Sequence, residues 1–170
     1  MKHRVQPANR LVGDICPPSD KSVSHRAAIL NSLAEGAAVI EYYSGVADCQ
    51  STLRCLRSMG VIAENIPIEG SESGAHSLKI SSPGLEGFIE PREILNAGNS
   101  GTTMRFLLGV LAAAPFVSVL TGDRSLRTRP MGRIVHPLVE MGCNIIGRQG
   151  GSLAPIAVRG GSLHLSLIHI

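Results

Sequence analysis

Residues 17–26 read Pro-Pro-Ser-Asp-Lys-Ser-Val-Ser-His-Arg and predict a turn that opens a helix. The two prolines end an extended segment, Asp20 can cap the helix, and apolar residues recur at helical spacing over Val23–Leu33. A similar stretch, Asn-Ala-Gly-Asn-Ser-Gly-Thr-Thr-Met-Arg, occupies residues 96–105 and precedes an apolar helix at Thr102–Ala112. Two segments with the same layout indicate an internal duplication.

The surrounding sequence supports this duplication. Arg105 lies 79 residues after Arg26, and Glu140-Met141-Gly142 lies 82 residues after Ser58-Met59-Gly60. The other predicted helices are Cys49–Ser58, capped by Asp48, and Met131–Glu140, and the predicted strands are Val5–Ile15, Ala38–Tyr43, Val61–Ile66, Ser77–Ile80, Phe116–Leu120, Asn144–Ile146 and Ile156–Val158. We therefore predict an α/β fold of two repeated β-α-β-α-β-β units, about residues 5–84 and about 85–164.

The composition narrows the class of protein. The chain has 170 residues, 44% hydrophobic and 17% charged, which excludes a disordered chain. A net charge of +3 with 3% aromatic residues argues against nucleic-acid binding. The longest weakly polar run, Phe106–Leu120, is too short to span a membrane and contains Pro115. The four cysteines form no C-x-x-C pair, and no Cys/His cluster has zinc spacing, so we expect a cytoplasmic protein with reduced thiols and no metal.

The first candidate site lies at the start of the first predicted helix. Lys21 stands at the opening of the helix, Ser22 offers a hydroxyl, and Arg26 follows one turn later on the same face. The unpaired amides of a helix N-terminus attract anions, and cations beside them strengthen that attraction. These residues predict a phosphate or carboxylate site, with a capped surface helix as the alternative.

The second and third candidates follow the duplication. Gly101 allows a ligand to approach the backbone, Asn99 and Thr102 flank it, and Arg105 lies four residues further. The loop Thr121–Met131 contains three arginines, of which Arg129 precedes a proline. A tight turn and a solvated basic loop are the alternatives. Asp48 is predicted to cap its helix or, alternatively, to orient an active-site arginine, and His25 and His136 are predicted to be structural or solvated.

Taken together, residues 17–26, 98–105 and 122–131 resemble the 3-phosphoshikimate 1-carboxyvinyltransferase (EPSP synthase) family in their sequence, order and spacing. The resemblance covers about residues 5–164. It implies a fold of two similar domains, each made of three such units, of which this chain holds about two. It also implies transfer of the enolpyruvyl group from phosphoenolpyruvate to the 5-hydroxyl of shikimate 3-phosphate, in the shikimate pathway to chorismate and the aromatic amino acids, with no cofactor.

The resemblance assigns roles to individual residues. Lys21 would lie between the two substrates and act in catalysis, and Ser22 and Arg26 would bind shikimate 3-phosphate. Phosphoenolpyruvate would be bound by Lys21 together with Asn99, Gly101, Thr102 and Arg129. Asp48 and Arg105 would support these groups. The full-length protein would be a monomer that binds these small molecules and neither nucleic acid nor a membrane.

The sequence departs from the family in two ways. It ends before the second domain, so we expect the chain by itself to be an inactive fragment. Residues 165–170 do not fit the family and are interpreted as an unrelated tail. The alternatives are an anion-binding module without catalysis and a UDP-N-acetylglucosamine enolpyruvyl transferase. The second alternative is disfavoured because Ser22 follows Lys21 and the segment 127–130 contains no cysteine.

Overall fold

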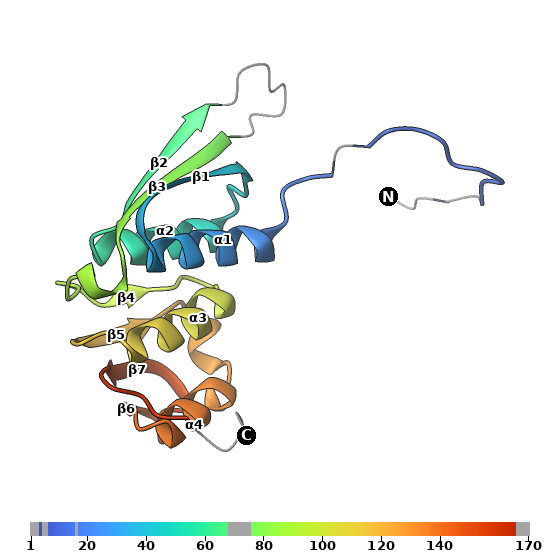
Figure 1. Ribbon diagram of the computed structural model, residues 1–170. Helices are drawn as coiled ribbons and strands as arrows, with labels where there is room; N and C mark the ends of the chain where they lie inside the picture. The colour runs from blue at the N-terminus through green and yellow to red at the C-terminus, as the bar shows by residue number, and fades with distance from the viewer. Residues whose placement is uncertain (1–3, 5–6, 16, 68–75, 166–170) are drawn as a thin grey trace.

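The computed structural model describes residues 4, 7–15, 17–67 and 76–165, which form two α/β halves (Figure 1). The first half contains α1 (Lys21–Leu33), β1 (Glu35–Tyr43), α2 (Ala47–Ser58), β2 (Ile62–Pro67) and β3 (His76–Pro83). The second half contains β4 (Leu95–Asn96), α3 (Gly101–Ala112), β5 (Val117–Thr121), α4 (Gly132–Glu140), β6 (Asn144–Arg148) and β7 (Leu153–Arg159). Short 3₁₀ turns lie at Leu85–Gly87 and Leu126–Thr128.

Both halves build their sheets in the same order. In the first half β3 lies between β1 and β2 and pairs antiparallel with both. In the second half β7 lies between β5 and β6 in the same way, and β4 adds a parallel strand beside β5. The order helix, strand, helix, strand, strand therefore occurs twice, which confirms the predicted α/β fold of repeated units.

The ends of the second helix in each half show the repeat at the level of single residues. Gly60 follows α2 with φ +94°, and Gly142 follows α4 with φ +93°. Residues with a Cβ rarely adopt this backbone conformation, so glycine at both positions allows the chain to leave the helix in the same direction. The pairing of these two glycines in the sequence thus corresponds to a shared local geometry.

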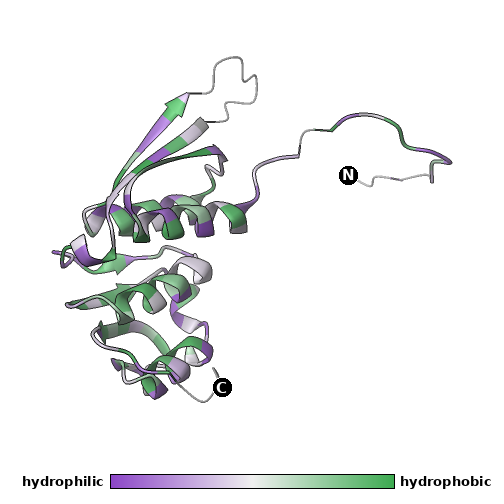
Figure 2. Cartoon of the chain, in the orientation of Figure 1, coloured by the Kyte–Doolittle hydropathy of each residue, from purple (hydrophilic) through white to green (hydrophobic). Residues whose placement is uncertain are grey.

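The two halves share a core of aliphatic side chains, in which Tyr43 and Phe88 are the aromatic members among the described residues. Helix α3 joins the halves, because it contacts α1 and α2 as well as α4 and β7. Apolar residues run along most of its length (Figure 2), and Met104, Leu107 and Leu108 are fully buried. Burial of such side chains contributes about 1.5–3 kcal/mol each, so the position of α3 is strongly fixed.

The prediction of a strand at Val5–Ile15 is wrong for the described residues 7–15. This segment runs away from the body of the molecule (Figure 1) and contains no strand. Leu11 is 90% exposed and Ile15 is 89% exposed. A segment with scattered apolar residues forms a strand only where a neighbouring strand and an apolar face are present, and the described part of the chain offers neither to this segment.

Four of the observed strands, β1, β3, β6 and β7, are longer than their apolar patterns predict, while β2 and β5 keep the predicted length with a shift of one residue. Predicted strand Ser77–Ile80 is the centre of β3, and Ile156–Val158 is the centre of β7. Each of these strands pairs on both edges, and backbone pairing extends β3 into polar residues such as Ser81 and Ser82, which carry no hydrophobic signal. The two-residue strand β4 was not predicted, because it is too short to show a period.

Candidate functional site

The first part of the candidate site is the N-terminus of α1. The carboxylate of Asp20 caps the helix by accepting a hydrogen bond from the Val23 amide at 2.6 Å. Lys21 is the first helical residue, and its Nζ lies 3.0 Å from Oδ2 of Asp48 in α2, while its side chain stays 51% exposed. The ion pair orients the ammonium group at the opening of the helix, and the exposure leaves it accessible to a ligand.

Asp48 does not cap α2, so that part of the prediction is wrong. The N-cap is Val46, which makes no side-chain bond, and Asp48 lies in the first turn. Three residues before α2 begins, the Ser44 amide donates a hydrogen bond to Oγ of Ser24 in α1 at 3.1 Å. This contact attaches the segment that leads into α2 to α1. A carboxylate in the first turn is favoured by the helix dipole, and here it is also free to hold Lys21.

The second part of the site is the N-terminus of α3. Oγ of Ser100 caps this helix and accepts a hydrogen bond from the Thr103 amide at 3.1 Å. Gly101 is buried, and a Cβ built on it would lie 2.9 Å from Nη1 of Arg105 and 3.6 Å from Nη1 of Arg129. Two guanidinium groups therefore converge over the first residue of α3. A side chain at position 101 would occupy the space next to these groups.

A network of hydrogen bonds holds Arg129 in this place. Nη2 of Arg129 donates to Oδ1 of Asn99, and Nδ2 of Asn99 donates to Oδ2 of Asp123 at 2.6 Å. Asp123 in turn accepts from the Leu126 amide and donates its own amide to the Gly98 carbonyl. The hydrogen bond from Asn99 is the largest cause that lowers the pKa of Asp123, so this carboxylate is ionised and stabilises the loop.

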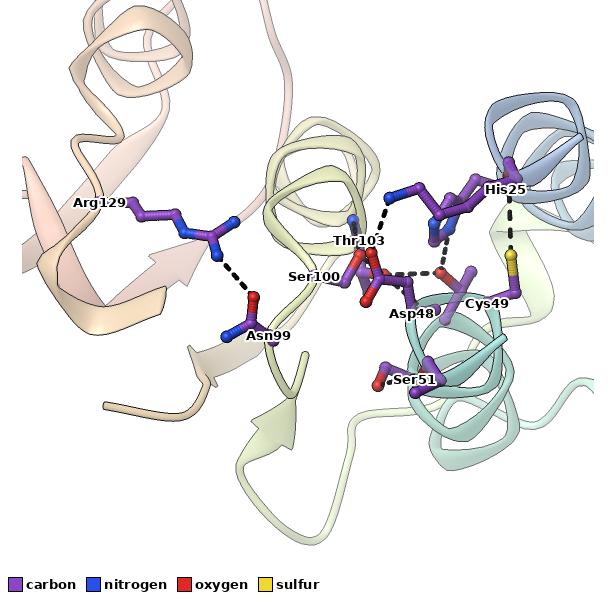
Figure 3. Close-up of polar contacts among 11 residues, drawn as sticks. His25, Asp48, Cys49, Ser51, Asn99, Ser100, Thr103 and Arg129 are labelled. Carbon is purple, nitrogen blue, oxygen red and sulfur yellow. Dashed lines mark hydrogen bonds and ion pairs between the residues drawn. The ribbon is translucent and has the colours of Figure 1, made fainter. Parts of the chain in front are cut away.

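Figure 3 shows the start of α3 between these two groups of residues. Asn99 and Arg129 lie on one side of it, and Asp48 lies on the other. The cations Lys21, Arg105 and Arg129 and two capped helix N-termini thus frame one region. Such an arrangement attracts phosphate and carboxylate groups, because cations and helix amides both stabilise negative charge.

A chain of buried hydrogen bonds lies beneath this surface. Nδ1 of His25 is 2.7 Å from Oγ1 of Thr52, which is 2.7 Å from Oγ1 of Thr103. Oγ1 of Thr103 donates to Oγ of Ser100 at 2.8 Å. His25 has no exposed surface, and burial is the largest cause that lowers the pKa of its imidazole. His25 is therefore neutral at pH 7, which agrees with the predicted structural role.

The burial of His25 gives a testable pH dependence of stability. Below the usual imidazole pKa of about 6.5 the unfolded chain binds a proton at His25 that the folded chain binds only at lower pH. The free energy of unfolding is therefore expected to fall as the pH decreases below 6.5, by up to about 1.4 kcal/mol per pH unit for this one proton. Urea unfolding at pH 7.5 and 5.5 gives the change in the free energy of unfolding with pH. This pH slope is compared between the parent chain and its His25→Asn variant.

The expected result is a smaller pH dependence in His25→Asn. The matched control is His136→Asn, which removes an exposed imidazole from α4 and should leave the contribution of His25 in place. An equal slope in the His25→Asn variant and in the parent chain would contradict the prediction. If the variant does not fold, the ring resonances of His25 in the parent chain answer the same question, because they should stay in the neutral form through pH 6.5.

The family model described as EPSP synthase (3-phosphoshikimate 1-carboxyvinyltransferase) matches residues 5–170. This chain belongs to the EPSP synthase family. The matched range includes the predicted tail 165–170, of which 166–170 lie outside the described residues, so the interpretation of the tail stays a prediction.

Individual EPSP synthases agree with this assignment. The 3-phosphoshikimate 1-carboxyvinyltransferase of Pelotomaculum thermopropionicum is 51% identical over 153 residues, which are 90% of this chain and 34% of the relative. That of Herpetosiphon aurantiacus is 48% identical over 164 residues, 96% of this chain and 36% of the relative. A solved EPSP synthase structure from Acinetobacter baumannii matches 88% of this chain and 32% of its own with a TM-score of 0.77 at 40% identity. The chain thus spans about a third of the length of these relatives.

The structure places most of the residues predicted for an EPSP synthase site in two groups, one around Lys21 and one around Arg129. Lys21 contacts Asp48, Asn99 contacts Arg129, and Gly101 lies under Arg105 and Arg129. Ser22 and Arg26 are exposed on α1, and Thr102 is half-buried in the first turn of α3. No hydrogen bond joins Ser22 or Arg26 to either group within the described ranges.

Sequence reasoning missed the residues that connect these groups. Asp123 anchors Asn99, and Thr52 links α1 to Thr103 in α3. Asp123 could have been found from the sequence, because an aspartate at the start of a turn commonly accepts a hydrogen bond from a backbone amide a few residues later. Here the amide is that of Leu126. Thr52 and Thr103 gave no signal, since a threonine inside a helix is usually part of the solvated or packed surface.

Two absences concern the described residues. No group of three or more His, Cys, Asp and Glu side chains there has metal-binding geometry, and Cys49, Cys55 and Cys143 are buried free thiols. Cys16 lies outside the described residues. None of the described helices is both long enough and apolar enough to cross a membrane.

Proposed function

We propose that this chain provides part of the active site of an enolpyruvyl transferase that acts on shikimate 3-phosphate and phosphoenolpyruvate. The observation that carries the proposal is the convergence of the Arg105 and Arg129 guanidinium groups over Gly101 at the N-terminus of α3. The ion pair of Lys21 with Asp48 lies on the other side of the same helix N-terminus. Both substrates are anions, so the charge and the geometry fit them.

Phosphoenolpyruvate is assigned to the α3 side. Arg129 would pair with its carboxylate or phosphate, and the amides near Gly101 and Thr102 would donate to the same groups. Asn99 would keep the guanidinium of Arg129 in place, and Arg105 would support the loop through its bond to the Pro130 carbonyl at 3.3 Å. The absence of a side chain at Gly101 leaves the bound anion close to the backbone.

Shikimate 3-phosphate is assigned to the α1 side. Ser22 and Arg26 are exposed on the first turns of α1, where a phosphate would also meet the helix amides. Lys21 would lie between the substrates, and Asp48 would orient its ammonium group. The proposed reaction begins when the 5-hydroxyl of shikimate 3-phosphate gives up its proton, and its oxygen attacks C2 of phosphoenolpyruvate, while C3 takes up a proton. Inorganic phosphate then leaves C2 as the new methyl group gives up a proton, which forms the enolpyruvyl ether.

The protein contributes charge stabilisation to both steps. Negative charge on the phosphate grows as its bond to C2 breaks, and fixed cations stabilise this charge without the reorganisation that water requires. Lys21 is proposed for proton transfer as well as charge stabilisation. From the internal duplication we also propose units near residues 5–84 and 85–164. The family resemblance supports a monomer without a cofactor, and the composition supports a cytoplasmic protein without a nucleic-acid or membrane partner.

A chimeric enzyme tests the proposed function. The 153 aligned residues of this chain replace the matching segment of the Pelotomaculum thermopropionicum relative, which supplies the remaining two thirds of the protein. We expect the purified chimera to release phosphate only when both shikimate 3-phosphate and phosphoenolpyruvate are present. The isolated 170-residue chain is the control and is expected to show no turnover.

Binding and turnover of the chimera distinguish an enzyme from an anion-binding module without catalysis. A folded chimera that binds both substrates but does not turn over would favour the anion-binding module over the enzyme. A folded chimera that binds neither substrate would contradict the whole assignment of the site. Folding is checked by thermal unfolding and binding by titration calorimetry with each substrate.

A further inference from the structure

The buried hydrogen-bonded chain beneath the site connects three helices. His25 belongs to α1, Thr52 to α2, and Thr103 and Ser100 to the start of α3. All four side chains have no exposed surface. The proposed function leaves this chain without a role, because none of the four residues reaches the surface where the substrates would bind.

The position of the proton on His25 determines which groups in the hydrogen-bonded chain donate and which accept. Nε2 of His25 is buried without a partner in the described structure, while Nδ1 contacts Thr52. An unpaired buried N–H costs more than an unpaired lone pair, so the tautomer with the proton on Nδ1 is favoured. His25 then donates to Thr52, Thr52 donates to Thr103, and the Thr103 hydroxyl donates to Ser100 or to the Asp48 carbonyl at 3.4 Å. Each of the two threonine hydroxyls is thereby used once as a donor, and Oγ of Ser100 accepts at the end of the chain.

The chain ends at groups that position the candidate site. His25 lies one turn after Lys21 in α1, and Thr103 lies two residues after Gly101 in α3. Ser100 is also the N-cap of α3, and Asp48 holds the ammonium group of Lys21. We propose that the His25–Thr52–Thr103–Ser100 chain is a positioning device that sets the spacing between the N-termini of α1 and α3. The inference rests on the proposed function, since these two helices carry the two substrate sites.

Polar contacts suit this task better than apolar packing. Apolar side chains tolerate small sliding of one helix on another, because dispersion energy changes gradually with distance. A buried hydroxyl that loses its hydrogen-bond partner is left without the water that would solvate it, so a displacement that breaks the 2.7 Å contact between Thr52 and Thr103 is strongly disfavoured. A buried network in which every hydroxyl is hydrogen-bonded therefore selects one spacing of the helices.

The kinetic consequence is specific. Each substrate meets mainly the N-terminus of one helix, so a change in helix spacing leaves each binding site largely intact. The reacting atoms of the two substrates are then misplaced relative to each other, and misplacement of about 1 Å can cost up to about 100-fold in rate. Loss of the chain should therefore lower kcat more than it changes either KM.

The test compares two substitutions of Thr103 in the chimera. Thr103→Val removes the hydroxyl and keeps the shape, and we expect kcat to fall about 10-fold or more while both KM values stay within about 3-fold. Thr103→Ser restores the hydroxyl and should recover most of kcat. Ser118→Ala is the matched control, because Oγ of Ser118 is also buried but has no partner in the described structure, and it should leave kcat unchanged.

A second readout does not depend on turnover. In the 170-residue chain, Thr103→Val should shift the ring nitrogen resonances of His25, although Thr103 does not touch the ring, because Thr52 loses its acceptor. Unchanged His25 resonances, or a Thr103→Val variant whose kcat equals that of the parent, would overturn the inference. An inactive parent chimera with the resonance shift would refute the proposed function and still support the hydrogen-bonded coupling of the three helices.

Discussion

Replacement of Lys21 by alanine in the chimera is expected to lower kcat by at least about 10³-fold while the protein stays folded. Lys21 combines two roles in the proposed reaction, charge stabilisation and proton transfer. Loss of one charge-stabilising donor commonly costs about 10²–10³-fold in kcat, and general acid–base catalysis contributes about 10²–10⁴-fold. The side chain is half exposed and outside the core, so its removal should change the melting temperature little.

The matched control is Lys79→Ala, which removes an exposed lysine from β3. This variant should keep the kcat and both KM values of the parent chimera. Steady-state assays of phosphate release over a range of both substrates measure these parameters. A Lys21→Ala variant with turnover near that of the parent would show that Lys21 does not act in the chemical step.

The start of each functional helix could be predicted from the sequence because its signal is local. Asp20 and Ser100 are capping residues within a few positions of the helices they begin, and Gly101 marks a close approach of other groups to the backbone. The duplication then pointed to both segments at once. Local chemistry and the repeat together were sufficient to predict the α/β fold, and they indicate the region of the candidate site, which stays a prediction.

The remaining features depend on contacts between distant residues. Thr52 and Thr103 are 51 positions apart and meet only because α2 packs on α3. The residues that hold Arg129 lie up to 30 positions away, so the spacing of the arginines did not show which one would be fixed. The prediction of a strand was wrong for residues 7–15 because their apolar residues have no partner strand among the described residues.

Arg129→Ala is expected to lower kcat/KM for phosphoenolpyruvate on the order of 10²-fold in the chimera. The guanidinium is held by Asn99 and lies at 3.4 Å from Oγ of Ser125, so it is oriented before the substrate arrives. Its fixed planar fork can pair with two oxygens of a carboxylate or phosphate, which is why Arg129→Lys should recover only part of the loss. The effect on KM for shikimate 3-phosphate should be small, because Arg129 lies on the α3 side.

The loop itself provides the control for Arg129. Arg127 is exposed in the same loop and carries the same charge, so Arg127→Ala changes the net charge equally. Because surface charges are largely screened by salt, this variant should keep kcat/KM for phosphoenolpyruvate within about 2-fold of the parent. Steady-state kinetics with phosphoenolpyruvate as the varied substrate compares the two variants. Equal losses in both would mean that the loop attracts anions by its overall charge, and the specific site formed by Gly101 and Arg129 would then be refuted. A loss confined to Arg129→Ala requires the oriented guanidinium that Asn99 and Asp123 hold in place.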